Sequence, residues 1–156
     1  MNSGFIIARL QPFHANHKLS IEDAQRHYDR FSIGIYVTPI SPSNPFTYEE
    51  RKRMVEYDIN GADVFPFHRP ENFISSFRAL KGKVGGSTFV SGDARKLFAA
   101  KVLGFDTEYM PRRDGPTGSY VRGLIYSRNP EYRKYVNPVT VSIVEDQIFR
   151  SRLLSR

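Results

Sequence analysis

Residues 5–17 read Phe5-Ile6-Ile7-Ala8-Arg9-Leu10-Gln11-Pro12-Phe13-His14-Ala15-Asn16-His17, and the interpretation of the whole chain starts from this stretch. Its first half is a short apolar run that predicts a buried strand. An arginine and two histidines three residues apart follow, just before a helix that we expect to begin near Lys18. Helix N-termini, imidazoles and guanidinium groups all donate hydrogen bonds to phosphate oxygens. The stretch therefore predicts a phosphate-binding turn between a strand and a helix.

Apolar runs alternate with helical patterns along the rest of the chain. Thr47 and Glu50 form the capping box of one predicted helix. The predicted strands are 5–10, 31–37, 63–67, 88–90 and 105–110, and the predicted helices are 18–28, 48–59, 72–80, 94–102, 119–126 and 136–154. Strands separated by helices imply a parallel sheet with right-handed crossovers. We therefore expect an α/β fold: a Rossmann-like five-stranded parallel sheet with helices on both faces, a C-terminal helical segment, and a single domain over 1–156. The loops after the first, second, fourth and fifth strands should converge on one site, because ligands of such sheets bind beyond the carboxyl ends of the strands.

Composition narrows the class of partner. The chain carries 23 Lys and Arg against 16 Asp and Glu, a net charge of +7, which favours anionic partners. Its basic residues are dispersed and carry no RNA-binding signature, so a phosphate-rich small molecule is favoured over nucleic acid. The absence of cysteine excludes disulfides, thiolate catalysis and cysteine-ligated zinc. No apolar run approaches the ~20 residues that cross a bilayer, and residues 1–4 lack signal-peptide features, so we expect no membrane partner and a cytoplasmic location.

Four motifs in order resemble the nucleotidyltransferases of the HxGH type, and most closely the archaeal-type nicotinamide mononucleotide (NMN) adenylyltransferases. Residues 9–14, Arg-Leu-Gln-Pro-Phe-His, look like the family's G-R-[MF]-Q-P-F-H opening. Residues 44–51, Asn-Pro-Phe-Thr-Tyr-Glu-Glu-Arg, are similar to its N-P-F-T-x-x-E-R segment. Ser91-Gly92-Asp93 resembles its S-G-N turn, and residues 117–122, Thr-Gly-Ser-Tyr-Val-Arg, resemble [ST]-[GS]-[ST]-x-[IV]-R. The resemblance spans roughly residues 5–126.

This resemblance implies attack of a substrate phosphate on the α-phosphorus of ATP, with release of pyrophosphate. The implied acceptor is NMN and the implied product is NAD. The nucleophile is already an anion, so catalysis rests on positioning and charge stabilisation rather than on a general base. Mg²⁺ is expected to bind mainly through the ATP phosphates and water, without a protein metal site. The family commonly assembles into symmetric oligomers, so a homo-oligomer is also implied.

The resemblance also implies a role for each matching residue. The catalytic residues are His14, His17, Arg9 and Arg122. The ATP and phosphate contacts are Phe13, Asn16, Gly118, Ser119, Val121 and Arg113. The acceptor contacts are Thr38, Arg51, Phe73, Phe77, Ser91, Gly92 and Asp93. Arg51 and Arg113 serve either phosphate contact or loop positioning.

The chain departs from the family's pattern at three places. Asn16 stands where the motif has glycine, so its side chain is expected to shift the adenine or to hydrogen-bond to it. Gly115 stands where the archaeal loop has its second arginine. The chain has no tryptophan to stack on the nicotinamide, and Phe73 or Phe77 is the expected substitute.

Several alternatives remain open from the sequence. Ser119 and Asp93 can each be helix caps, and for Asp93 the cap is favoured over a base contact. Arg51 can belong to a solvated helix face. For the whole chain, transfer of AMP or CMP to another phosphorylated acceptor competes with NMN adenylylation. A non-catalytic nucleotide-binding module is a further alternative, and nucleic-acid binding is a distant one.

Overall fold

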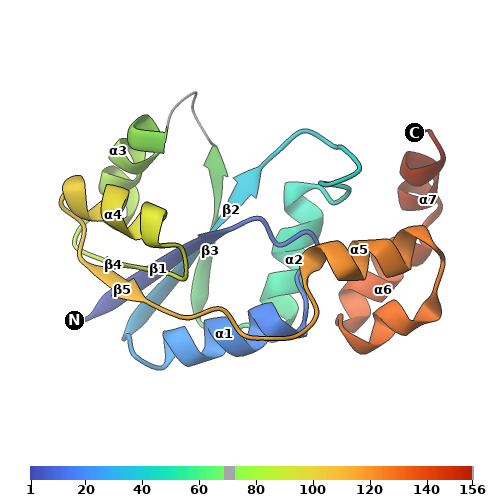
Figure 1. Ribbon diagram of the computed structural model, residues 1–156, viewed down its shortest axis with the longest axis horizontal. Helices are drawn as coiled ribbons and strands as arrows, with labels where there is room; N and C mark the ends of the chain where they lie inside the picture. The colour runs from blue at the N-terminus through green and yellow to red at the C-terminus, as the bar shows by residue number, and fades with distance from the viewer. Residues whose placement is uncertain (69–72, 156) are drawn as a thin grey trace.

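A computed structural model describes residues 1–68 and 73–155 and confirms the predicted α/β fold (Figure 1). Its sheet has five parallel strands in the order β3-β2-β1-β4-β5. The strands are β1 (Ser3–Ala8), β2 (Arg30–Val37), β3 (Ala62–His68), β4 (Thr88–Ser91) and β5 (Thr107–Tyr109). The chain moves outward in one direction from β1 to β3 and then returns to pair β4 with the other edge of β1. This reversal defines a topological switch point between β1 and β4.

Helices cover both faces of the sheet, as the alternation of apolar side chains requires. On one face, Ile6, Ile33 and Val90 pack with α1 (Ala15–Gln25), α2 (Tyr48–Asp58) and the C-terminal helices. On the other face, Phe5 and Phe89 pack with α3 (Phe73–Val84) and α4 (Ala94–Val102). Figure 1 shows α3 and α4 together on one side, with α1, α2 and α5 (Gly118–Tyr126) grouped on the other. Neighbouring residues of β1 therefore anchor two separate cores.

The first helix begins earlier than the sequence predicts. It starts at Ala15 rather than near Lys18, because the His14 side chain is its N-cap and accepts a hydrogen bond from the Asn16 N–H. Imidazole is not among the preferred capping groups, so the residue pattern did not reveal this start. The predicted capping box of α2 is confirmed: Thr47 accepts from the Glu50 N–H, and Glu50 accepts from the Thr47 N–H.

The C-terminal segment is helical as predicted, but it is divided. A 3₁₀ turn, η1 (Pro130–Lys134), precedes α6 (Pro138–Glu145) and α7 (Gln147–Leu154). The prediction of one helix over 136–154 was wrong at Asp146, where the backbone is extended and the carboxylate caps α7 through the Ile148 N–H. In that conformation the chain turns between α6 and α7, and Arg152 of α7 forms an ion pair with Glu50 at the start of α2.

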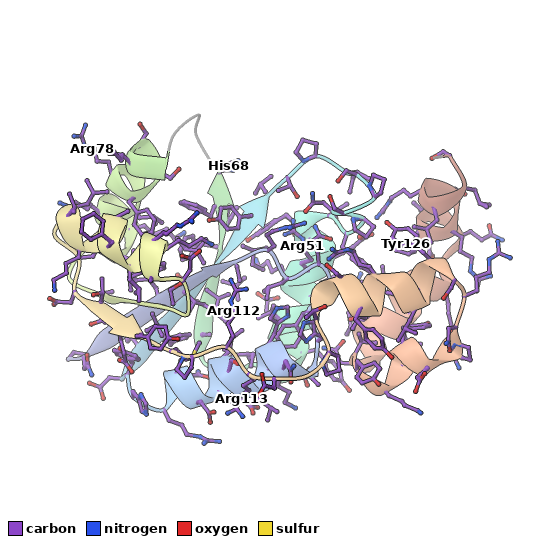
Figure 2. The ribbon with its side chains drawn as sticks, in the orientation of Figure 1. Arg51, His68, Arg78, Arg112, Arg113 and Tyr126 are labelled. Carbon is purple, nitrogen blue, oxygen red and sulfur yellow. The ribbon has the colours of Figure 1, made fainter. Side chains whose placement is uncertain are left out.

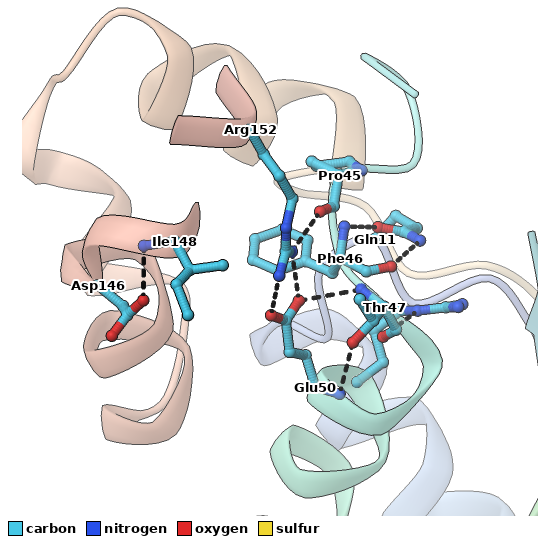
Figure 3. A network of polar contacts seen from close by, with 9 residues as sticks. Gln11, Pro45, Phe46, Thr47, Glu50, Asp146, Ile148 and Arg152 are labelled. Carbon is cyan, nitrogen blue, oxygen red and sulfur yellow. Dashed lines mark hydrogen bonds and ion pairs between the residues drawn. The ribbon is translucent and has the colours of Figure 1, made fainter. Parts of the chain in front are cut away.

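A polar network fixes the loops that leave β1 and β2 against each other (Figure 3). Gln11 and Phe46 exchange two hydrogen bonds, of 2.9 and 3.0 Å, between the Gln11 carboxamide and the Phe46 backbone. From α7, Arg152 donates to both carboxylate oxygens of Glu50, at 2.7 and 2.9 Å, and to the carbonyl of Pro45. These contacts hold the two loops at the carboxyl edge of the sheet in one arrangement.

Candidate active site

The candidate site lies at the carboxyl ends of β1 and β4, where the strand order reverses. Residues 9–14 follow β1, residues 92–93 follow β4, and the loop 110–117 follows β5. Crevices at switch points of this kind are the usual ligand sites of open parallel sheets. The predicted motifs therefore converge at one edge, as the parallel topology requires.

Two imidazoles form the centre of this edge. His14 and His17 stack with ring centroids 3.8 Å apart at the N-terminus of α1. Burial lowers the pKa of His14 to about 4. Burial, together with repulsion by His14, lowers the pKa of His17 to about 3, while a contact with the Pro12 carbonyl opposes part of the change. Both rings are therefore neutral at physiological pH in the absence of a ligand.

Their hydrogen bonds also determine which ring nitrogen carries the proton. The Nδ1 of His14 accepts from the Asn16 N–H at 3.2 Å, and the Nδ1 of His17 accepts from the His14 N–H at 3.4 Å. A neutral imidazole that accepts at Nδ1 carries its proton on Nε2. The reciprocal cap thus places the proton of each ring on Nε2, without two fixed positive charges.

Three arginines gather on the segment that leads from β1 to the imidazoles: Arg9 belongs to it, and Arg51 and Arg122 donate to its backbone. Arg51 is fully buried in α2 and donates to the carbonyls of Thr47 and Arg9, at 3.1 and 2.6 Å. Its Nη2 is buried without a hydrogen-bond partner. Burial and the positive charge of Arg9 lower the pKa of Arg51 to about 10. This is a retained positive charge with an unsatisfied donor in the protein interior.

The other two guanidinium groups bind only neutral oxygens. Arg9 donates from Nη2 to the Ser43 carbonyl and to Asn44 Oδ1, at 2.9 and 2.8 Å. Arg122 donates to the Gln11 carbonyl at 2.6 Å and to Ser119 Oγ at 3.0 Å. Burial and repulsion by Arg9 lower the pKa of Arg122. Among residues 1–68 and 73–155, no carboxylate forms an ion pair with any of the three arginines. The cluster is therefore electrostatically incomplete and suited to an anionic ligand.

The N-terminus of α5 lies beside this cluster. Its cap is Thr117, whose hydroxyl accepts from the Tyr120 N–H, so the reading of Ser119 as the N-cap was wrong. Ser119 is exposed in the first turn and contacts Arg122 instead. A Cβ on Gly118 would lie 3.3 Å from the Gln11 carbonyl oxygen, so this turn sits directly against the loop after β1. The first-turn N–H groups of α5 thereby lie beside the arginines.

The loop after β5 corrects one predicted contact and supplies one that sequence reasoning missed. Arg113 forms an ion pair with Asp23 of α1, so the structure does not bring it into the phosphate site. Figure 2 shows Arg112 directed toward the middle of the sheet, whereas Arg113 lies against α1. A Cβ on Gly92 would lie 3.1 Å from Cγ of Arg112, which places Arg112 on the turn after β4. Consecutive side chains of an extended segment point in opposite directions, and this was the available clue to Arg112.

The predicted acceptor residues divide into two groups. Ser91, Gly92 and Asp93 form the turn into α4: the Ser91 hydroxyl accepts from the Asp93 N–H, and Asp93 caps α4 through the Arg95 and Lys96 N–H groups. The cap interpretation of Asp93 is confirmed. Thr38 follows β2 with its hydroxyl buried and without a hydrogen-bond partner. These residues remain at the correct edge of the sheet for a ligand contact.

The second group does not face this edge. Phe77 is 1% exposed and packs edge-on against Phe89, at a centroid distance of 5.0 Å, so it is a core residue and not a stacking platform. The side chain of Phe73 lies outside the described residues. Val121 and Phe13, which were predicted as ATP contacts rather than acceptor contacts, are buried in the other core, although Phe13 still stacks on His17 at 6.2 Å. The structure therefore supports the phosphate half of the site more fully than the acceptor half.

The fold is that of the α/β nucleotidyltransferase class, with a cluster of arginines at the switch-point edge. Solved structures with the same fold include a bifunctional NMN adenylyltransferase/ADP ribose pyrophosphatase from Francisella tularensis, at a TM-score of 0.76 and 15% identity over 98% of this chain and 52% of that one. A putative nicotinate-nucleotide adenylyltransferase from Vibrio parahaemolyticus matches at 0.68 and 13% identity, over 94% of this chain and all of the other. The chain spans about half the length of the Francisella protein.

Sequence comparison identifies the family. The nicotinamide-nucleotide adenylyltransferase of Methanolobus tindarius is 39% identical over 159 residues, which cover 94% of this chain and 89% of that protein. That of Methanoculleus marisnigri is 36% identical over 156 residues, covering 94% and 92%. No family model matches the sequence. The chain belongs to the nicotinamide-nucleotide adenylyltransferase family and is a nucleotidyltransferase.

Proposed function

We propose that this protein transfers the AMP portion of ATP to NMN, with NAD and pyrophosphate as products. The observation that carries the proposal is the pair of neutral, Nδ1-accepting imidazoles, His14 and His17, preceded by a segment on which three arginines without carboxylate partners gather. A polyphosphate would supply the missing negative charge. The family relationship to the archaeal adenylyltransferases supports NMN as the acceptor.

The two imidazoles would act on the phosphate groups as hydrogen-bond donors. The Nε2–H groups of His14 and His17 would bind oxygens on which negative charge grows during attack at the α-phosphorus. Because Nδ1 of each ring already holds a backbone N–H, the donors are oriented before ATP arrives. Preorganised donors of this kind stabilise the transition state without reorganisation during the reaction.

The arginines and the N-terminus of α5 would hold the pyrophosphate portion. In this proposal Arg122 leaves the Gln11 carbonyl to bind a phosphate, with Ser119 and Gly118 beside it. Arg51 would use its unpartnered Nη2 on the same ligand, and Arg9 would neutralise charge at the entrance. Bidentate guanidinium contacts position planar oxygen pairs, so these residues orient the leaving group as well as binding it.

The acceptor would lie against the turn after β4 and the loop after β5, which pack directly on each other. Ser91 and Gly92 would contact it from that turn, Thr38 would add its unpartnered hydroxyl, and Arg112 would bind the phosphate of the acceptor. The likeness to NMN adenylyltransferases, rather than an aromatic platform from Phe77, supports nicotinamide recognition.

Mg²⁺ would enter as the complex with ATP. Phosphate oxygens are the hard ligands that Mg²⁺ prefers, so ATP itself would hold the cation. Within the described ranges, no group of three His, Asp or Glu residues could hold a metal ion. The metal would supply charge neutralisation on the phosphates when bound.

None of the described helices has both the length and the apolar content to cross a bilayer. We propose that the whole chain acts as one cytoplasmic domain on these substrates.

The test is pyrophosphate release from Mg²⁺-ATP with NMN, with nicotinic acid mononucleotide, and without acceptor, followed by product mass. The proposal predicts release that requires NMN and a product with the mass of NAD. Turnover only with nicotinic acid mononucleotide would retain the reaction type and reject the acceptor. ATP binding without turnover with either acceptor would contradict the proposal.

A further inference from the structure

The side chain of Asn16 ties the first helix to the loop before α5. Its Nδ2 donates to the Pro116 carbonyl at 3.1 Å and to the Asp114 carbonyl at 3.4 Å, across about a hundred residues of sequence. Both acceptors are backbone oxygens, so the N–H side of the carboxamide faces the loop. The side chain therefore points to the loop. The sequence had led us to expect it to act on a bound adenine instead.

Gly115 is the complement of this contact. It has φ of +128°, a region that L side chains rarely adopt, and a Cβ there would lie 2.9 Å from Nδ2 of Asn16. Asn16 and Gly115 are two of the places at which the chain departs from the motifs that it otherwise matches. The structure brings these two departures into direct contact, so each accounts for the other.

The same residue reaches both phosphate-binding helix ends. The backbone N–H of Asn16 binds Nδ1 of His14, while its side chain holds Pro116, which directly precedes the α5 cap Thr117. Two other side-chain contacts join these regions: the ion pair of Arg113 with Asp23, and the bond from Arg122 to the Gln11 carbonyl. In the proposed function Arg122 exchanges that bond for a phosphate, which leaves the carboxamide as the remaining side-chain tie of the loop to α1 beside the Arg113 ion pair.

We propose that Asn16 is a positioning residue for ATP: its carboxamide holds the loop 114–116 so that the N-termini of α1 and α5 face the same polyphosphate. This role rests on the proposed function. Without the tie, the loop and the first turn of α5 would have to be ordered when the ligand binds, which weakens binding. Asn16 acts through the backbone of the loop and makes no required contact with the base.

The variants Asn16→Ala and Asn16→Gly remove the tie without adding charge. The matched control is Gln25→Ala, which removes a similar bond, from Nε2 to the Asn60 carbonyl at 2.7 Å, at the other end of the same helix. Calorimetry would give Kd for ATP and for inorganic tripolyphosphate, which has no base. We expect both Asn16 variants to bind both ligands about tenfold more weakly, and Gln25→Ala to bind them within about twofold of wild type.

Four results would overturn the role. Wild-type affinity for both ligands in the Asn16 variants would show that the tie is unimportant. Loss of affinity for ATP alone would make Asn16 a base contact. Additive losses of Gly115→Ala and Asn16→Gly in a double-mutant cycle would also contradict it, because removing the Asn16 side chain should relieve part of the Gly115→Ala defect. Hydrogen exchange of residues 113–118 should increase in Asn16→Ala and not in Gln25→Ala, and unchanged exchange would reject the tie. Failure of the wild-type protein to bind ATP would instead overturn the proposed function.

Discussion

Acid should destabilise the ligand-free protein because its two central imidazoles are buried as neutral bases. The ordinary histidine pKa is near 6.5, whereas the fold holds His14 at about 4 and His17 at about 3. Between these values the unfolded chain binds protons that the folded chain excludes. The stability contributed by the neutral rings is therefore complete above about pH 6.5 and decreases as the pH falls toward the folded values.

The size of the effect follows from these pKa values. At about pH 5 each histidine is almost fully protonated in the unfolded chain and almost fully neutral in the folded one. The resulting loss of unfolding free energy, relative to about pH 7, is about 2 kcal/mol per ring and about 4 kcal/mol for the pair. Such a change is a large part of the stability of an ordinary domain.

Urea unfolding followed by far-ultraviolet circular dichroism measures this change directly, since the chain has no tryptophan to report by fluorescence. The variant His14→Asn/His17→Asn keeps a capping group at residue 14 and cannot titrate in this range. We expect it to lose about 4 kcal/mol less than wild type between about pH 7 and about pH 5, with each single variant in between. Equal losses in the double variant and wild type would refute the assignment of buried neutral rings. Comparison with wild type cancels the titration of all other groups.

Four further substitutions test the placement of individual side chains. Arg51→Met should leave the thermal midpoint unchanged or higher and weaken ATP binding by about tenfold or more, because it removes a buried charge with an unpartnered Nη2. Calorimetry measures both quantities, and a large loss of stability with full ATP affinity would contradict the prediction. Phe77→Ala should lower the unfolding free energy by about 3–5 kcal/mol and leave KM for NMN unchanged at a temperature where the variant is folded. A raised KM with an unchanged unfolding free energy would restore the predicted stacking role of Phe77. Arg112→Ala should raise KM for NMN about tenfold, whereas Arg113→Ala should change this KM little. Arg113→Ala should lower the unfolding free energy by less than about 1 kcal/mol, as expected for an exposed ion pair. Steady-state kinetics in which Arg113→Ala raises KM and Arg112→Ala does not would reject the orientation of the loop.

The sheet and most helix starts could be predicted because their causes are local. Apolar runs such as 31–37 alternate with helical patterns, and alternation of this kind has few topological solutions. Thr47 and Asp93 are preferred capping residues, and both caps are confirmed. The start of α1 was missed by three residues because its cap is His14, whose capping bond depends on the ring being neutral and buried.

The site residues could be predicted where the course of the backbone alone brings them to the edge of the sheet. They could not be predicted where side-chain packing decides which way a residue faces. Residues 9–17 and 117–122 follow strand ends and open helices, so their convergence follows from topology. Phe77 lies on a helix whose inward face could not be distinguished from a ligand-facing one before α3 was placed on the sheet. Arg112 and Arg113 are adjacent and chemically identical, and only the position of Asp23 on α1 separates their roles. The Asn16–Gly115 contact joins segments about a hundred residues apart and has no local signature.

The central claim is that the imidazole pair supports adenylyl transfer to NMN. The most direct test is a single-turnover experiment with Mg²⁺-ATP and NMN in which NAD is identified by mass, comparing wild type with His17→Ala. The account predicts NAD formation by wild type and a rate reduced by about 10²-fold or more in His17→Ala, with ATP still bound and the fold intact by circular dichroism. A rate for His17→Ala near that of wild type, or the absence of NAD with an ATP-bound wild-type protein, would contradict it.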